Sequence, residues 1–119
     1  MDKTIISCAL YDYISELEIV DCHEHLIPEA DAAAAKADFS DLFGHYSRRD
    51  FLSAGMTEKE TERFYDMNTP LEEKWKLFSR FYPLVEDTGY IRSARIVLKK
   101  RYGVDRLTEE NYRAVSEAV

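Results

Sequence analysis

The chain has 119 residues, with 23 acidic and 16 basic side chains and a formal net charge of −7 at neutral pH. This length suits one domain, and a hydrophobic content of 45% is sufficient for a single core. Because an acidic surface repels phosphate backbones and anionic lipids, we expect no nucleic-acid partner. No apolar run approaches the roughly 20 residues of a spanning helix, so we expect no membrane partner and a cytoplasmic location.

The sequence contains two cysteines, Cys8 and Cys22. They do not form a CxxC pair, and two cysteines are too few for a disulfide framework. We therefore expect two small buried side chains with no redox or metal role.

The first thirty residues contain a helix pattern followed by a strand pattern. Apolar side chains recur at helical spacing near residues 4–16 and predict an amphipathic helix. The short run from Glu18 to His23 is partly β-branched and is bounded by polar residues and Pro28. This pattern predicts a buried strand over about 18–23, the only convincing strand in the sequence.

The residues from about 40 to 119 are predicted to be helical. They follow an alanine-rich stretch, Ala30–Asp38, that predicts either a weak surface helix or a loop. A short helix is predicted over Ser47–Ala54 and stops at Gly55.

Two capping signals mark the starts of the next helices. Thr57 begins a capping box for a helix that runs to about Asp66. Thr69 as N-cap and Pro70 at the first helical position predict the start of a longer helix, which we expect Pro83 to end. Three aromatic side chains on this helix are expected to build the core: Trp75, Phe78 and Phe81.

The C-terminal third carries two more helix patterns. Residues 91–102 keep helical spacing and end at Gly103 with basic side chains in the last turn. Thr108 begins another helix pattern that shows no stop signal by Val119. We therefore expect the natural domain to continue, with this chain an isolated piece, a truncated reading frame or one part of a larger assembly.

His23 and His25 are the candidate metal ligands. In a strand, alternate side chains share a face, so Asp21, His23 and His25 are expected to project together. Neutral imidazoles are good ligands for zinc and similar divalent ions, and a carboxylate can orient an imidazole ring from behind. A catalytic zinc takes three or more protein ligands, so the pair alone does not complete a site, and ordinary core or surface histidines remain the alternative.

The stretch EIVDCHEHLIPE resembles the first strand of the amidohydrolase superfamily. The stretches GHYSRRDFLSAGMTE, EEKWKLFSRFYP and YGVDRLTEENY resemble the helical insertion that follows this strand in the uronate isomerase-like branch and its amidohydrolase relatives. The resemblance implies an α/β fold class, the N-terminal part of a metal-dependent (β/α)8 TIM barrel, here mostly α-helical with one clear strand. It implies a first strand at about 18–23, a helical insertion at about 40–119 and an incomplete domain.

The same resemblance implies functional residues. It makes His23 and His25 ligands of a divalent metal, zinc by preference, and it makes Tyr46, with His45 beside it, a substrate contact. A partly buried aromatic is the alternative for Tyr46. The remaining metal ligands and the aspartate that serves as general base are expected beyond residue 119, so the isolated chain is expected to be inactive.

The resemblance implies hydrolysis at a carbon centre of a small-molecule substrate by a metal-activated water. One alternative is the uronate isomerase-like interconversion of an aldose and a ketose form of a sugar acid. Another is a non-catalytic helical interaction domain, and a third is a small metal module in which His45 joins the other two histidines. Assembly into a homo-oligomer is left open.

Overall fold

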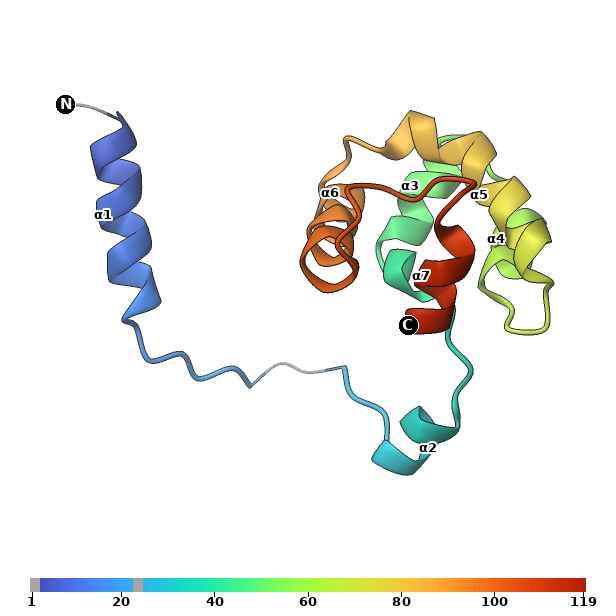
Figure 1. The fold of residues 1–119 in the computed structure, drawn as a ribbon, viewed down its shortest axis with the longest axis horizontal. Coiled ribbons are helices and arrows are strands. Elements are labelled where there is room, and N and C mark those ends of the chain that lie inside the picture. Colours follow the sequence, from blue (N-terminus) through green and yellow to red (C-terminus); the bar gives the residue numbers. More distant parts are fainter. Residues whose placement is uncertain (1–2, 23–24) are drawn as a thin grey trace. The chain divides into compact units, whose positions relative to one another are not determined.

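The computed structural model describes residues 3–22 and 25–119, and every regular element in these ranges is a helix (Figure 1). The chain divides into two units, Met1–Ala34 and Ala35–Val119. The first unit contains α1 (Lys3–Ser15) and α2 (Glu29–Ala34). The second contains the 3₁₀-helix η1 (Phe39–Phe43), α3 (Ser47–Ser53), α4 (Glu58–Tyr65), α5 (Leu71–Val85), α6 (Gly89–Val97), the π-helical turn η2 (Leu98–Tyr102) and α7 (Tyr112–Ala118).

The predicted strand at 18–23, and with it the α/β fold class as part of a TIM barrel, is wrong. Residues Glu18–Cys22 form no β-bridge within the described ranges, and His23 lies outside them. A strand is stable only when its backbone N–H and C=O groups form hydrogen bonds with a neighbouring strand. β-Branched side chains favour a strand but cannot supply that neighbour. The described chain is a helical protein.

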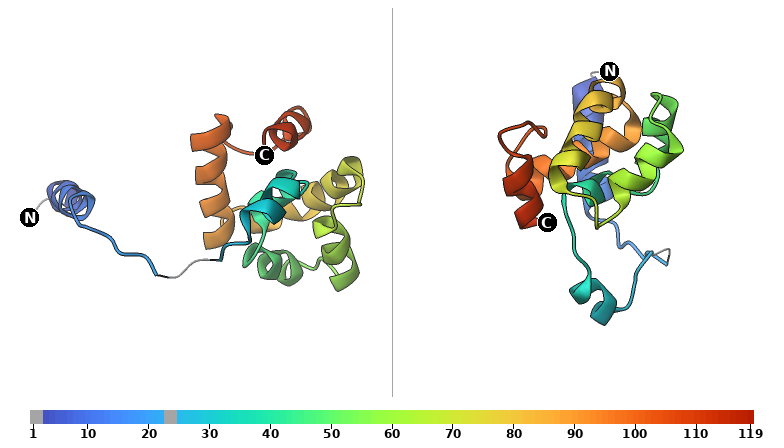
Figure 2. Two further views of the ribbon diagram at one scale, coloured as in Figure 1. Left: turned by 90° about the horizontal axis from the view of Figure 1, so that it is seen from below. Right: turned by 90° about the vertical axis from the view of Figure 1, so that its right-hand side faces the viewer.

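In the second unit, α3 contacts α4, α5 and α6, while η1 contacts α4, α6 and α7. Figures 1 and 2 show α3 to α7 gathered into one cluster of helices. The core between them is mainly aromatic, and its fully buried rings belong to Phe39, Phe43, Phe51, Phe64 and Phe78. Trp75 and Phe81 are also buried, which confirms the predicted core face of α5.

One capping signal places a helix start correctly, and the other places its start one residue too early, because α5 has Pro70 as its N-cap and begins at Leu71. Thr57 accepts a hydrogen bond from the Glu60 backbone N–H, and the Glu60 carboxylate accepts one from the Thr57 N–H. This capping box begins α4 as predicted. The predicted stop after α3 is confirmed as well, because Gly55 has a φ of 102°, a value that favours glycine.

Pro83 does not end α5, which continues to Val85. A proline removes one backbone donor, and here the carbonyl that loses its partner belongs to the exposed Ser79, where water can bind it. Tyr82 and Val85 are buried and fix the last turn against the core. The helix predicted from Thr108 also begins later, at Tyr112, since a turn in which the Asn111 side chain accepts from the Thr108 N–H comes first.

A buried ion pair joins η1 to α5. Lys74 is fully buried, and its ammonium donates to the Asp38 carboxylate at 2.6 Å and to the Ser40 hydroxyl at 3.1 Å. Asp38 is also the N-cap of η1, where it accepts a hydrogen bond from the Ser40 N–H. Burial acts to raise the pKa of Asp38, but the hydrogen bonds from Lys74 and Ser40 outweigh it and hold this pKa below its usual value.

We predict that Asp38→Asn lowers the free energy of unfolding by about 3–5 kcal/mol, because asparagine keeps the cap but leaves the Lys74 charge buried and unpaired. Chemical denaturation measures this change. A matched control is Asp105→Asn, which breaks an exposed pair with Lys99 and is expected to leave the stability nearly unchanged. Equal effects of the two substitutions would contradict a special role for the buried pair.

The lowered pKa of Asp38 also predicts an acid dependence. A carboxyl group whose folded pKa lies below its unfolded value adds stability that is complete above the unfolded pKa, about 3.9, and is lost as pH falls through the folded pKa. The stability difference between wild type and Asp38→Asn should therefore be constant near neutral pH and shrink below about pH 4.

Candidate functional site

The described residues on either side of the histidine pair are exposed and have no regular secondary structure. Glu18–Cys22 and His25–Pro28 lie between α1 and α2, while His23 and Glu24 lie outside the described residues. Val20 is 85% exposed and Leu26 is 82% exposed, so the apolar side chains around the histidines are not covered. His25 is exposed as well.

The described residues do not complete a metal site. Within 3–22 and 25–119 no three histidine, cysteine or acidic side chains come close enough to share an ion. Cys8 and Cys22 are free and exposed, which corrects the expectation that they are buried. The segment therefore offers exposed donors such as His25, but a full set of ligands is not found in these ranges, and we assign no reaction step to a metal.

Tyr46, the predicted substrate contact, lies at the start of α3 and is 57% exposed. Its ring stacks on Tyr90 with a centroid separation of 5.1 Å and an interplanar angle of 21°. The preceding residue, His45, has a φ of 54°, which few residues other than glycine adopt. Backbone strain of this kind is common at functional sites, and here it leads directly into the exposed tyrosine pair.

Two side-chain hydroxyl groups tie neighbouring elements of the helical unit together. The Thr88 hydroxyl donates to the Asp50 carboxylate at 2.5 Å and ties α3 to the start of α6. The Tyr65 hydroxyl donates to the Phe43 carbonyl at 2.6 Å. Burial raises the pKa of Tyr65 well above its usual value, so this side chain is a neutral donor and not a base.

The two arginines of α3 differ in their surroundings. Arg48 forms an ion pair with Glu58 at 2.6 Å, and Arg49 is exposed. The Arg48 charge is therefore already balanced by a carboxylate and is a poor anchor for an anionic ligand. The arrangement at Tyr46 and Tyr90 is suited to stacking against a flat apolar or ring-shaped group.

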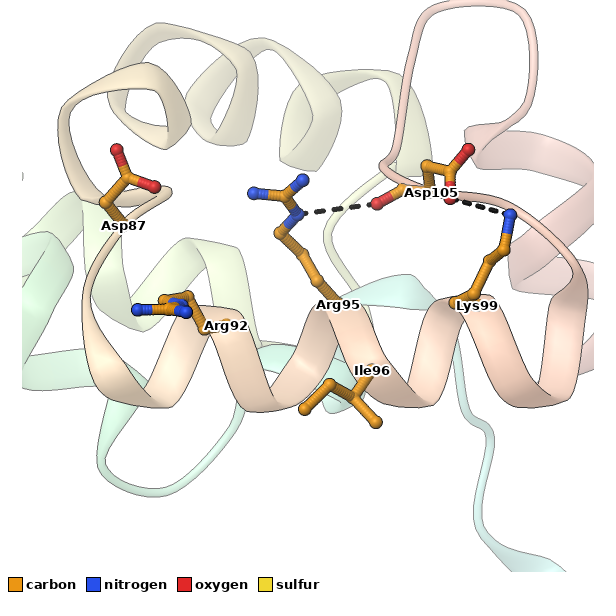
Figure 3. A pocket seen from close by; sticks show the side chains of 6 residues that line it. All are labelled: Asp87, Arg92, Arg95, Ile96, Lys99 and Asp105. Atoms are coloured by element: carbon orange, nitrogen blue, oxygen red, sulfur yellow. Dashed lines mark hydrogen bonds and ion pairs between the residues drawn. The ribbon is translucent and has the colours of Figure 1, made fainter. Parts of the chain in front are cut away.

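A groove that the sequence did not indicate runs along α6, with a volume of about 550 Å³ (Figure 3). Arg92 and Arg95 line it from α6 and Lys99 lines it from η2, while Asp87 and Asp105 line it from the adjoining loops. Lys99 pairs with the Asp105 carboxylate at 2.7 Å, and Arg95 donates to the Asp105 carbonyl at 3.4 Å. In the sequence, the helical spacing of Arg92, Arg95 and Lys99 could have indicated that they share one charged face. The basic run Lys99–Arg101 was interpreted only as the end of a helix.

Comparison with protein-family models, curated proteins and solved structures finds no match to this chain. No helix of the described residues is long and apolar enough to cross a membrane. A functional assignment therefore depends on the residues themselves and on the resemblance of the histidine stretch.

The tyrosine pair predicts a measurable coupling. In a double-mutant cycle of Tyr46→Ala and Tyr90→Ala, the two substitutions should couple by about 0.5–1.5 kcal/mol, because each removes the stacking partner of the other. Thermal or chemical denaturation of the four proteins measures this value. Strict additivity would show that the rings do not stack in solution.

Proposed function

We propose that this chain is part of a metal-dependent hydrolase related to the amidohydrolase superfamily, with His23 and His25 as two ligands of a divalent metal, zinc by preference. The observation that carries the proposal is the exposed apolar segment around these histidines. Full burial of a valine, leucine or isoleucine side chain contributes about 1.5–3 kcal/mol, so apolar residues left in water mark a surface that binds something.

The position of the histidines within that segment supports the proposal. Ile19 and Val20 precede them and Leu26 and Ile27 follow them, and all four side chains are exposed. Covering these side chains with another protein surface would place the imidazoles at the edge of an apolar environment. An apolar shell around a metal strengthens its effect on the ligands and on bound water.

A bound divalent metal supplies a water of lowered pKa for attack at a carbon centre. The residues of this chain would hold the ion and orient a small-molecule substrate, the second role falling to Tyr46. In the enzymes that the sequence resembles, the other ligands and the general base come from later in the chain. Isomerisation of a sugar acid is the alternative reaction for the same residues.

A second candidate is a non-catalytic helical interaction domain. The packing of Ala35–Val119 favours it, because this unit has its own buried aromatic core. Large apolar side chains are nevertheless exposed on it, among them Leu84 and Ile96. This candidate requires no role for the histidines and predicts folding and partner binding that do not respond to metal.

Zinc titration followed by calorimetry tests the metal proposal. We expect weak zinc binding by the wild-type chain, loss of that binding in His23→Ala and in His25→Ala, and no change in His45→Ala, which serves as the matched control. Each variant loses one imidazole. If zinc bound non-specifically to any imidazole, all three substitutions would therefore weaken zinc binding equally.

Each contrary outcome has a distinct meaning. A wild-type chain that binds no zinc contradicts the metal proposal and leaves the interaction domain as the candidate. An equal loss in His45→Ala contradicts the two-ligand assignment and favours a module built from three histidines.

A further inference from the structure

A second groove lies between α5 and the loop that precedes α7, with a volume of about 250 Å³. This is slightly below the range of about 300–1,000 Å³ that is typical of small-molecule sites, so it suits a ligand of modest size. Aromatic and aliphatic side chains form much of its lining, and two charged side chains of opposite sign also line it: Trp75, Phe78, Tyr82, Pro83 and Leu107, with Glu86 and Arg106.

Tyr82 carries a buried hydroxyl with no partner. The side chain is only 6% exposed, and its oxygen is the one buried side-chain polar atom of the described residues that makes no hydrogen bond. The ring is held in place by stacking on Phe78 at 4.6 Å and by an edge contact with Phe43 at 6.0 Å. Buried polar groups are nearly always hydrogen-bonded, so a ligand atom that reached this hydroxyl would gain a hydrogen bond that no protein group of the described residues supplies.

Charges of both signs act on the hydroxyl. Burial raises the pKa of Tyr82, the positive charges of Arg95 and Arg106 act to lower it, and the negative charges of Glu86 and Asp87 act to raise it. Glu86 and Arg106, which line the groove with Tyr82, are among these charges.

Glu86 and Arg106 do not neutralise each other. Both line this groove, yet within residues 3–22 and 25–119 their side chains form no ion pair or hydrogen bond with each other or with any other group. Two unpaired charges of opposite sign beside an apolar floor are complementary to a ligand that carries both charges and an apolar body.

We propose that this groove binds a free amino acid with an apolar or aromatic side chain. The ligand carboxylate accepts hydrogen bonds from the Arg106 guanidinium and, once the side chains that cover it move aside, from the buried Tyr82 hydroxyl, while the ligand ammonium donates to the Glu86 carboxylate. Its side chain packs against the aromatic floor at Trp75 and Phe78. This site uses none of the residues assigned to the metal and stands independently of that function.

The test is a titration of the full chain with L-phenylalanine, followed by NMR chemical shifts and calorimetry. Phenylacetate lacks the ammonium and phenethylamine lacks the carboxylate. Both are therefore expected to bind at least about tenfold more weakly than L-phenylalanine. Glu86→Gln and Arg106→Gln should each weaken L-phenylalanine binding about tenfold, whereas substitution of the exposed Lys59 of α4, Lys59→Gln, should leave it unchanged.

Tyr82→Phe supplies an independent check. Without ligand, this variant should melt at the wild-type temperature or higher, because it removes an unsatisfied hydroxyl and keeps the ring. With ligand, it should bind L-phenylalanine more weakly than wild type.

Three results would overturn the assignment. The first is that millimolar L-phenylalanine causes no NMR chemical-shift changes at the groove residues. The second is that phenylacetate binds as tightly as L-phenylalanine and that Glu86→Gln binds L-phenylalanine as tightly as wild type. The third is that ligand-free Tyr82→Phe melts at a lower temperature than wild type. The last result would mean that the hydroxyl already has a partner in the free protein.

Discussion

The ion pair between Lys74 and Asp38 is the contact on which the helical unit depends most. It joins the first residues of that unit to the first turn of α5, and it lies beside a core made mostly of aromatic rings. A charge with no access to water is tolerated only with good partners, and Lys74 has a carboxylate and a hydroxyl within hydrogen-bond distance. The pair therefore fixes where η1 can lie.

The position of η1 in turn determines the packing of the other helices. Phe39 and Phe43 on this short element are fully buried, and η1 contacts α4, α6 and α7. Phe39 makes ring contacts with Phe64, Trp75, Phe78 and Tyr112, which belong to three different helices. A 3₁₀-helix of five residues has little stability of its own, so its anchoring by Lys74 and its burial support each other.

The sequence predicted those features that local interactions determine. The capping box at Thr57 and the stop at Gly55 depend on neighbouring residues, and the aromatic spacing of α5 follows from helix geometry. Lys74 lies next to Trp75 and reads as an ordinary exposed lysine, because nothing local shows that Asp38, 36 residues earlier, will meet it. The strand prediction at 18–23 failed for the opposite reason, since pairing is not a local property.

The candidate sites differ in the same way. His23 and His25 were found from their spacing and their resemblance, while the groove at Tyr82 depends on Glu86 and Arg106 approaching from separate segments. Tyr46 was predicted as a substrate contact, but its stacking partner Tyr90 was not, because the two tyrosines meet only when α3 packs against α6. Sites formed by tertiary contacts carry little signal in a single sequence.

We propose that the exposed apolar segment around the histidines binds another protein surface, while the helical unit is held by its own buried aromatic core. Hydrogen exchange of the full chain, followed residue by residue, tests this proposal. The amides of Glu18–Cys22 and of Leu26 and Ile27 should exchange as fast as those of an unfolded peptide, while buried amides of α4 and α5 should be strongly protected. Protection of the histidine segment comparable to that of α5 would rule the proposal out, because the chain would then already cover the segment itself.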